Sequence, residues 1–171
     1  MDASVLINFL HIGQVLLLSR LPDLEPLIPD EVIGEVRLPE QQAELLKAIE
    51  AGDLTRICIT DPAILDTFAD LRDTLGKGEA ACLAIAQHNA GIVVACDEKG
   101  AFLRMATERL GEDRVLGTAD ILLRCIRAEL ISVAGADAAK GLLSTRKFRM
   151  PFVTFQDLVD AQPSRGPDDI K

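Results

Sequence analysis

Four acidic residues stand where a folded chain could bring their carboxylates to one place. Asp97 directly follows an apolar run at 92–96, and Asp2 heads a segment in which extended chain turns into a helical pattern. Glu35 and Glu79 lie in helical patterns among apolar neighbours, Glu79 in a first turn, where the helix dipole favours a carboxylate. In parallel α/β sheets, ligand chemistry gathers outside the carboxyl ends of the strands. The positions of Asp2 and Asp97 therefore favour a site at that edge.

The chemistry of such a site follows from the charge of its members. Clustered carboxylates cannot all remain ionised alone, so either one of them takes a proton or a cation binds. Oxygen ligands without a partnering His or Cys point to Mg²⁺ or Mn²⁺, ions that activate water and stabilise charge on a phosphodiester under attack. Spacing alone leaves two hypotheses open: a shared metal site, or acids on separate solvated faces.

The elements that must position these acids alternate along the chain. Extended or β-branched runs at 24–28, 56–60, 92–96 and around Val115 predict strands. Helical patterns cover 4–10, 14–19, a stretch from Asp30, 41–49, 61–75, 78–86, 101–110, 119–130 and 138–143. Strands separated by helices of this length predict an α/β fold with a central, mainly parallel twisted sheet in three α/β/α layers.

Composition limits the class of protein. The chain has 171 residues, of which 49% are hydrophobic, and this excludes intrinsic disorder. The apolar runs, such as that at 15–18, are too short to span a bilayer, and Asp2 stands where a secretory signal would be basic. The formal net charge of −9 argues against a broad basic face that would hold a phosphate backbone.

One domain over 1–160 with a flexible tail at 161–171 fits the length and the Pro- and Asp-rich end. The four cysteines are scattered without a CxxC pair, which favours small core residues in a reducing, cytoplasmic compartment over a zinc site or disulfides.

Five segments carry a family resemblance. They are Asp2-Ala3-Ser4-Val5-Leu6-Ile7-Asn8, Ile28-Pro29-Asp30-Glu31-Val32-Ile33-Gly34-Glu35-Val36, Gly76-Lys77-Gly78-Glu79-Ala80, Cys96-Asp97-Glu98, and Val115-Leu116-Gly117-Thr118 with the later Arg127-Ala128-Glu129-Leu130-Ile131. In this order they resemble PIN-domain proteins, metal-dependent nucleases that include the ribonuclease toxins of toxin–antitoxin pairs. The resemblance covers most of residues 2–145.

The resemblance implies a function and a ligand set. Asp2, Glu35, Glu79 and Asp97 would be the carboxylates that hold one or two Mg²⁺ or Mn²⁺ ions for the hydrolysis of RNA. It also implies a homodimer and a small protein antitoxin that blocks the acidic cleft. The family places several apolar residues of a first strand before the opening aspartate, whereas only Met1 precedes Asp2 here. Either that strand is very short, or the start is truncated or misassigned.

Four neighbouring residues have two interpretations each. Thr118 could orient water or phosphate or could cap a helix, and Ser4 could support the acids or form a local turn. Asp120 stands where the subgroup has a small residue, so it is either an additional acid or an ordinary first-turn acid. Glu98 could support the metal site or point into solvent beside Lys99.

Lys140, Arg146, Lys147 and Arg149 form a local basic stretch without an acid between Ala138 and Gln156. They could contact RNA beside the site, with the interleaved phenylalanines either stacking on bases or, as we favour, lying in the core.

Two alternatives to a nuclease remain. One is a PIN-fold interaction module with weak or no catalysis. The other is a dinucleotide site, because the segment from Gly76 to Ala81 fits G-x-G-x-x-A and Asp97 follows about twenty residues later. That motif requires a strand directly before its first glycine, whereas a helix is predicted there.

Overall fold

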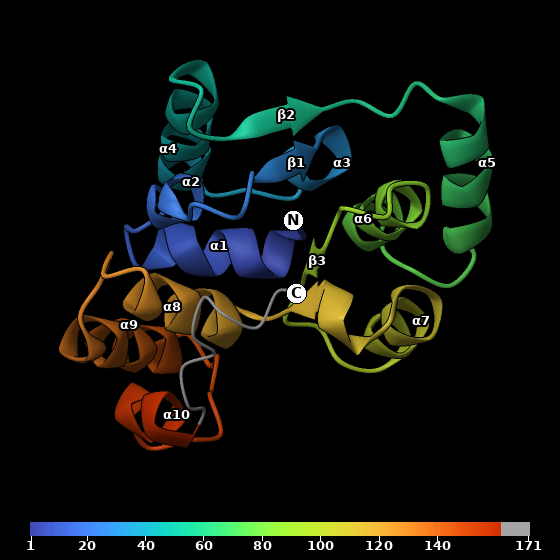
Figure 1. Cartoon of the computed structure of the whole chain (residues 1–171). Coiled ribbons are helices and arrows are strands. Elements are labelled where there is room, and N and C mark those ends of the chain that lie inside the picture. Colours follow the sequence, from blue (N-terminus) through green and yellow to red (C-terminus); the bar gives the residue numbers. More distant parts are fainter. Residues whose placement is uncertain (162–171) are drawn as a thin grey trace.

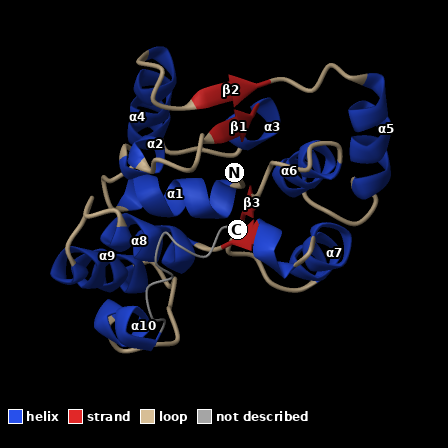
Figure 2. Ribbon diagram, viewed as in Figure 1, coloured by secondary structure: helices blue, strands red, loops and turns tan. Residues whose placement is uncertain are grey.

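The structure is a computed structural model, and it describes residues 1–161. Helices make up most of it, with short strands between them (Figure 2). In chain order the elements are α1 (Ala3–His11), α2 (Leu17–Arg20), β1 (Leu27–Pro29), α3 (Asp30–Ile33), α4 (Pro39–Glu50), β2 (Thr55–Ile57), α5 (Pro62–Leu71), α6 (Lys77–Gln87), β3 (Val94–Ala95), α7 (Ala101–Leu110), the 3₁₀ turn η1 (Glu112–Arg114), β4 (Val115–Leu116), α8 (Thr118–Arg127), α9 (Val133–Thr145) and α10 (Phe155–Ala161).

The strands form two parallel pairs. β1 pairs with β2, with Leu27 opposite Thr55, and β3 pairs with β4, with Val94 opposite Val115. Parallel pairing confirms the predicted α/β class, although the strands are only two or three residues long.

The first two residues lie between these pairs. The Met1 ammonium donates to the carbonyl oxygen of Leu27 in β1 at 2.8 Å, and the Asp2 N–H donates to the carbonyl oxygen of Ala95 in β3 at 2.9 Å. Successive backbone groups that point to opposite sides are typical of an extended strand. Met1 and Asp2 therefore act as a very short stretch of strand, which connects β1 to β3.

Helices cover the strands on two sides (Figure 1). α1 packs against α4, α8 and α9 on one side, and α6 packs against α5 and α7 on the other while touching β1 and β3. α6 approaches the strands closely because most of its residues are small or apolar and buried. This arrangement sets the amino end of α1 and the amino end of α6 on opposite sides of the strand ends.

Local signals predicted several boundaries well. The helical pattern predicted from residue 61 begins there, because the Asp61 side chain caps α5 by accepting from the N–H groups of Ala63 and Ile64 and Pro62 follows at the first helical position. Asp30 is the first residue of α3 rather than its cap, because its carboxylate pairs with Arg56 instead.

Other predictions need correction. Cys58 is exposed rather than a core residue, whereas the other three cysteines are buried, and all four are free thiols. α10 was not predicted, and Ala161 is its last residue; the rest of the predicted tail, 162–171, lies outside the described residues. Over the part of the chain that is described, no helix has both the length and the apolar character needed to cross a membrane.

Candidate metal centre

Asp97 follows β3 and is held by three hydrogen-bond donors. Its Oδ1 accepts from the Thr118 N–H at 2.8 Å, and its Oδ2 accepts from the Asn8 side-chain amide at 2.9 Å and from the Thr118 hydroxyl. Thr118 is fully buried as the first residue of α8. Its hydroxyl therefore fixes the Asp97 carboxylate rather than capping the helix.

Asp2 caps the amino end of α1. Its Oδ2 accepts from the Ser4 N–H at 3.2 Å and from the Ser4 hydroxyl at 2.8 Å, and the Asp2 side chain is almost completely buried. The Ser4 hydroxyl oxygen in turn accepts from the Asp97 N–H at 3.1 Å. Ser4 thus connects Asp2 to Asp97, so the two acids that sequence analysis placed at strand ends do lie close together.

Glu35 and Glu79 meet at the amino end of α6. The Gly78 N–H donates to Glu35 Oε1 at 2.8 Å, and the Gly76 N–H donates to Glu79 Oε2 at 2.8 Å. A Cβ atom on Gly78 would lie 3.0 Å from Glu35 Oε1, which is closer than side chains normally tolerate. Glycine at 78 is therefore needed for the Glu35 carboxylate to reach the helix.

The electrostatics show which acids face one another. Burial raises the pKa of Glu79, and the negative charges of Asp2, Glu98 and Glu35 raise it further against the lowering effect of the Gly76 N–H. Three acids from other parts of the chain thus act on Glu79. Repulsion of this kind favours the binding of a cation or a proton.

Opposing effects also act on the pKa of Asp97. Burial raises its pKa, and the neighbouring Asp120 adds to this, while the hydrogen bonds from Thr118 and Asn8 oppose it. Asp120 also accepts from the Gly117 N–H at 2.7 Å, so it is a first-turn acid that also acts on Asp97. The two interpretations of Asp120 made from the sequence are compatible.

The donor set suits a hard divalent cation. Asp2 Oδ1, Glu35 Oε2 and Glu79 Oε1 accept no hydrogen bond within the described residues, so each acid keeps one oxygen free while its other oxygen is anchored. Carboxylate oxygens without nitrogen or sulfur ligands suit Mg²⁺ or Mn²⁺. Among residues 1–161, no three His, Cys, Asp or Glu side chains are close enough together to hold an ion as they stand.

A pocket of about 400 Å³ opens beside Asp97. Glu98, Glu112 and Asp120 also line it, with Lys99 as the basic residue among them. Its wall is strongly acidic, so a phosphate group could approach it only with its charge offset by cations.

Two further residues contribute to the site. Asn8, which from the sequence could either support the acids or form a local turn, donates to both Asp97 and Thr118. Cys96, interpreted as a small core residue, places its Sγ 3.5 Å from Asp2 Oδ2 and accepts from the Glu98 N–H at 3.3 Å. The position of Cys96 directly before Asp97 was the signal in the sequence for a role in the site. Its apolar neighbours favoured the interpretation as a core residue instead.

The basic stretch lies away from these acids. Arg146 acts electrostatically on His11 at the carboxyl end of α1, whereas Asp2 caps the amino end. A nine-residue helix spans about 14 Å, which separates the two features. The Lys140 ammonium donates to the Val153 carbonyl and lies over the Phe152 ring, while Arg146, Lys147 and Arg149 are exposed.

The phenylalanines of this stretch belong to the protein interior. Phe155 is fully buried, and Phe148 and Phe152 pack against the core. The dinucleotide alternative also loses support, because α5 and a turn, rather than a strand, precede Gly76.

A family model described as a PIN domain matches residues 1–157. No curated protein and no solved structure matches the chain.

Proposed function

Because the chain belongs to the PIN-domain family, whose fold is of nuclease type, we propose that it is a divalent-metal-dependent endoribonuclease. The substrate would be single-stranded or structured RNA, and the role would be that of the toxin in a toxin–antitoxin pair. The observation that carries the proposal is the convergence of acids on Glu79, whose pKa is raised by burial and by Asp2, Glu98 and Glu35.

The ligands for the ion would be Asp2, Glu35, Glu79 and Asp97. Three of these acids keep a free oxygen beside an anchored one, which is the state of a carboxylate ready to bind a cation. When bound, Mg²⁺ or Mn²⁺ supplies activation of water and stabilisation of the charge that develops on the phosphodiester.

The chain's own residues position this set. Thr118 and Asn8 fix both oxygens of Asp97, and Ser4 holds Asp2 and the Asp97 backbone in one arrangement. The N–H groups at the amino end of α6 hold Glu35 and Glu79. Partners that orient metal-binding side chains typically change metal affinity or activity tenfold to a hundredfold when they are removed.

RNA would reach the site from the basic side of α9. Arg146, Lys147 and Arg149 are exposed and would bind phosphates about one helix length from the acids. Lys140 is committed to Val153 and Phe152, so we expect it to contribute less.

The partners also belong to the proposal. A homodimer and a small antitoxin with cationic side chains would suit the acidic pocket beside Asp97. The free cysteines suit a reducing compartment such as the cytoplasm.

Cleavage of RNA tests the proposal directly. A 5′-labelled single-stranded RNA is incubated with Mn²⁺ and with the unaltered protein, Asp97→Asn, or the matched control Asp66→Asn, in which the replaced acid is exposed on α5. We expect cleavage by the unaltered protein and by Asp66→Asn, loss of cleavage in Asp97→Asn, and loss in all three with EDTA. Equal cleavage by all three proteins would show that the acids are not used, and no cleavage by any of them would indicate a non-catalytic interaction module.

A further inference from the structure

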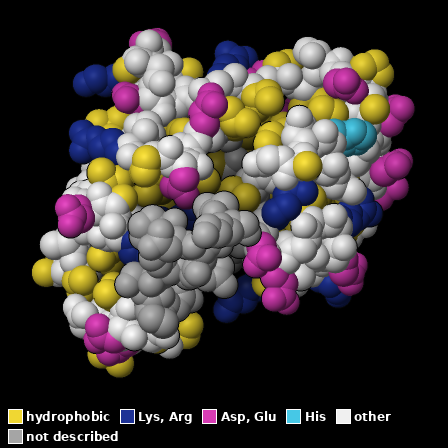
Figure 3. All heavy atoms as spheres, viewed as in Figure 1, with side chains coloured by type: hydrophobic (Ala, Val, Ile, Leu, Met, Phe, Trp, Pro, Cys, Tyr) yellow, Lys and Arg dark blue, Asp and Glu magenta, His cyan; other side chains and the backbone are white. Residues whose placement is uncertain are grey.

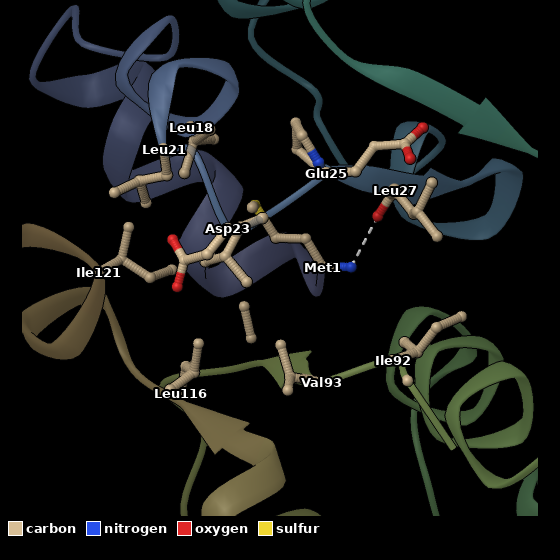
Figure 4. Close-up of a pocket in the computed structure, with 14 residues that line it drawn as sticks. Met1, Leu18, Leu21, Asp23, Glu25, Leu27, Ile92, Val93, Leu116 and Ile121 are labelled. Carbon is tan, nitrogen blue, oxygen red and sulfur yellow. Dashed lines mark hydrogen bonds between the residues drawn. The ribbon is translucent and has the colours of Figure 1, made fainter. Parts of the chain in front are cut away.

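The strand β4 lies between two pockets. Because successive side chains of a strand point to opposite faces, Leu116 lines a pocket of about 250 Å³, shown in Figure 4, and Val115 lines the pocket of about 400 Å³ beside Asp97. The walls of the first pocket are mostly leucine, isoleucine and valine. The pocket beside Asp97 combines apolar with charged side chains, and it adjoins the candidate metal centre.

Leu103 and Val115 give the pocket beside Asp97 an apolar wall. Leu103 and Thr107 lie one turn apart on α7, which packs against β4, and Val115 lies on β4 itself. The Leu103 side chain is 40% exposed and lines the pocket together with charged residues. An unstacked nucleobase packs against apolar side chains in this way and keeps its edge for hydrogen bonds.

The three acids of this pocket differ in what they face. Burial and Asp120 raise the pKa of Asp97, and burial and Glu98 raise the pKa of Glu79, so both of these acids act on the candidate metal centre. Glu112 has no such effect on either group, and it precedes β4, whereas Asp120 follows it. The Glu112 carboxylate makes no hydrogen bond or ion pair with any other of residues 1–161, so it is available to a ligand.

The lining of the pocket disfavours a phosphate and suits a base. Glu98, Glu112 and Asp120 would repel an anion, whereas a neutral base can donate hydrogen bonds to a carboxylate. Guanine offers two adjacent donors, N1–H and the N2 amino group, and two parallel hydrogen bonds to one carboxylate are strong and specific. Uracil offers one N–H between two carbonyl oxygens, and a carboxylate repels both of them.

We propose that the pocket beside Asp97 is a guanine subsite for the RNA substrate, in which the base packs on Leu103 and Val115 and donates N1–H and N2–H to the Glu112 carboxylate. The inference rests on the proposed function, because a base held beside Asp97 brings its own phosphate to the metal centre. A volume of about 400 Å³ has room for one base with its ribose. Lys99, the basic residue of the lining, can donate to guanine O6 or N7.

Four labelled hexanucleotides test the preference for guanine. Each has five uridines and carries G, A, C or U at its third position. They are bound to the Glu79→Gln variant, in which we expect no cleavage and whose altered residue lies outside the lining of the pocket. Fluorescence anisotropy should show that the RNA with G binds at least about tenfold more tightly than each of the other three. Equal binding of all four, or no binding of any, would overturn the proposal.

Glu112→Gln, made in the same background, tests the assigned contact. A glutamine amide offers one acceptor and one donor side by side, which matches adenine rather than guanine. We expect the preference for G to fall at least about tenfold and the RNA with A to become the tightest ligand. The matched control Glu108→Gln, exposed on α7 and outside the lining, should keep the preference for G. An unchanged preference in Glu112→Gln would overturn the assignment, whereas a merely structural role of Glu112 would weaken all four RNAs alike.

Cleavage of the same four RNAs by the unaltered protein with Mn²⁺ separates this proposal from the proposed function. Cleavage of all four at equal rates, together with equal binding, would leave the nuclease in place and remove the guanine subsite. A preference for G in binding without any cleavage would keep the subsite, as part of an RNA-binding module, and remove the nuclease.

Discussion

In the candidate metal centre, ionisation is disfavoured at the carboxyl groups of Glu79 and Asp97. The pKa of each carboxyl is raised, first by burial and then by other acids. A carboxyl whose pKa is raised in the folded state contributes stability below its unfolded pKa and loses it as pH rises through the folded value. At neutral pH and without a cation, both groups therefore reduce the stability of the fold.

Glu79→Gln tests this sign. The glutamine oxygen can still accept from the Gly76 N–H, while the charge is removed. In cation-free buffer we expect Tm of the variant to exceed that of the unaltered protein by about 1–3 °C at pH 7, and the difference to vanish near pH 3.5. Thermal unfolding followed by circular dichroism measures it, with Glu50→Gln on the exposed end of α4 as the control. A variant less stable at pH 7 would contradict the assignment.

Thr118 is predicted to act through Asp97. Thr118→Val removes the hydroxyl donor and keeps the backbone N–H that also holds Asp97. We expect Mn²⁺ affinity to fall about tenfold to a hundredfold, and RNA cleavage to fall in parallel. Thr145→Val is the matched control, because the hydroxyl of Thr145 donates to the Leu142 carbonyl of its own helix. Equal Mn²⁺ affinity in the two variants would remove Thr118 from the site.

At the scale of elements, the amino end of α6 organises half of the site. Gly76 and Gly78 offer N–H groups to two acids that are 44 residues apart in sequence, and the absence of a side chain at 78 makes room for Glu35. The short Gly-Lys-Gly segment therefore has a steric role.

Gly78→Ala should separate the effect of this glycine on helix stability from its effect on the position of Glu35. Alanine favours helix formation, yet its Cβ would displace the Glu35 carboxylate, which lies 3.0 Å from that position. We expect a large loss of Mn²⁺-induced stabilisation in a folded protein. Gly141→Ala in α9, where no atom lies within 4 Å of an added Cβ, should raise the free energy of unfolding by up to about 1 kcal/mol and leave the response to Mn²⁺ unchanged. An unchanged response in Gly78→Ala as well would contradict this account.

Elements with local signals could be predicted, and those with distant partners could not. Asp61-Pro62 marks the start of α5, because the cap and the proline act within one turn. α10 was missed because its first N–H group, that of Phe155, donates to Asp137 on α9, and this partner is far away in sequence. The run at 92–96 gives a two-residue strand, since its partner β4 has only two residues before Gly117, the N-cap residue of α8.

The same distinction applies to the site. The four acids stood out by position, and Asp2 and Asp97 proved to be neighbours through Ser4. The roles of Asn8 and Cys96 depend on contacts across about 90 residues, which neither composition nor periodicity indicates.

At the scale of the molecule, the net charge of −9 is a sum over parts of the surface that differ in charge. Acidic and basic side chains are interspersed over the face in Figure 3, so no broad basic surface appears there. Acids gather around Asp97 and Glu79, while exposed basic residues follow α9. The surplus of acid is thus compatible with an RNA substrate that is bound weakly and with the help of cations.

Lys147→Glu tests the path for RNA. In the Asp97→Asn background, in which we expect no cleavage, RNA binding should be weaker. The slope of log K against log[salt] should be smaller in magnitude by about 0.7 for each lost phosphate contact. Lys47→Glu makes the same charge change on α4 and should have little effect. Fluorescence anisotropy at several salt concentrations measures both. An equal loss in the two variants would indicate only a general effect of net charge.

The central claim is that the convergent acids form one divalent-cation site, and calorimetric titration with Mn²⁺ tests it most directly. The account predicts saturable binding of one or two ions to the unaltered protein, unchanged binding in Glu50→Gln, and at least about tenfold weaker binding in Glu79→Gln. Equal affinity in all three proteins, or no binding to any of them, would contradict the claim.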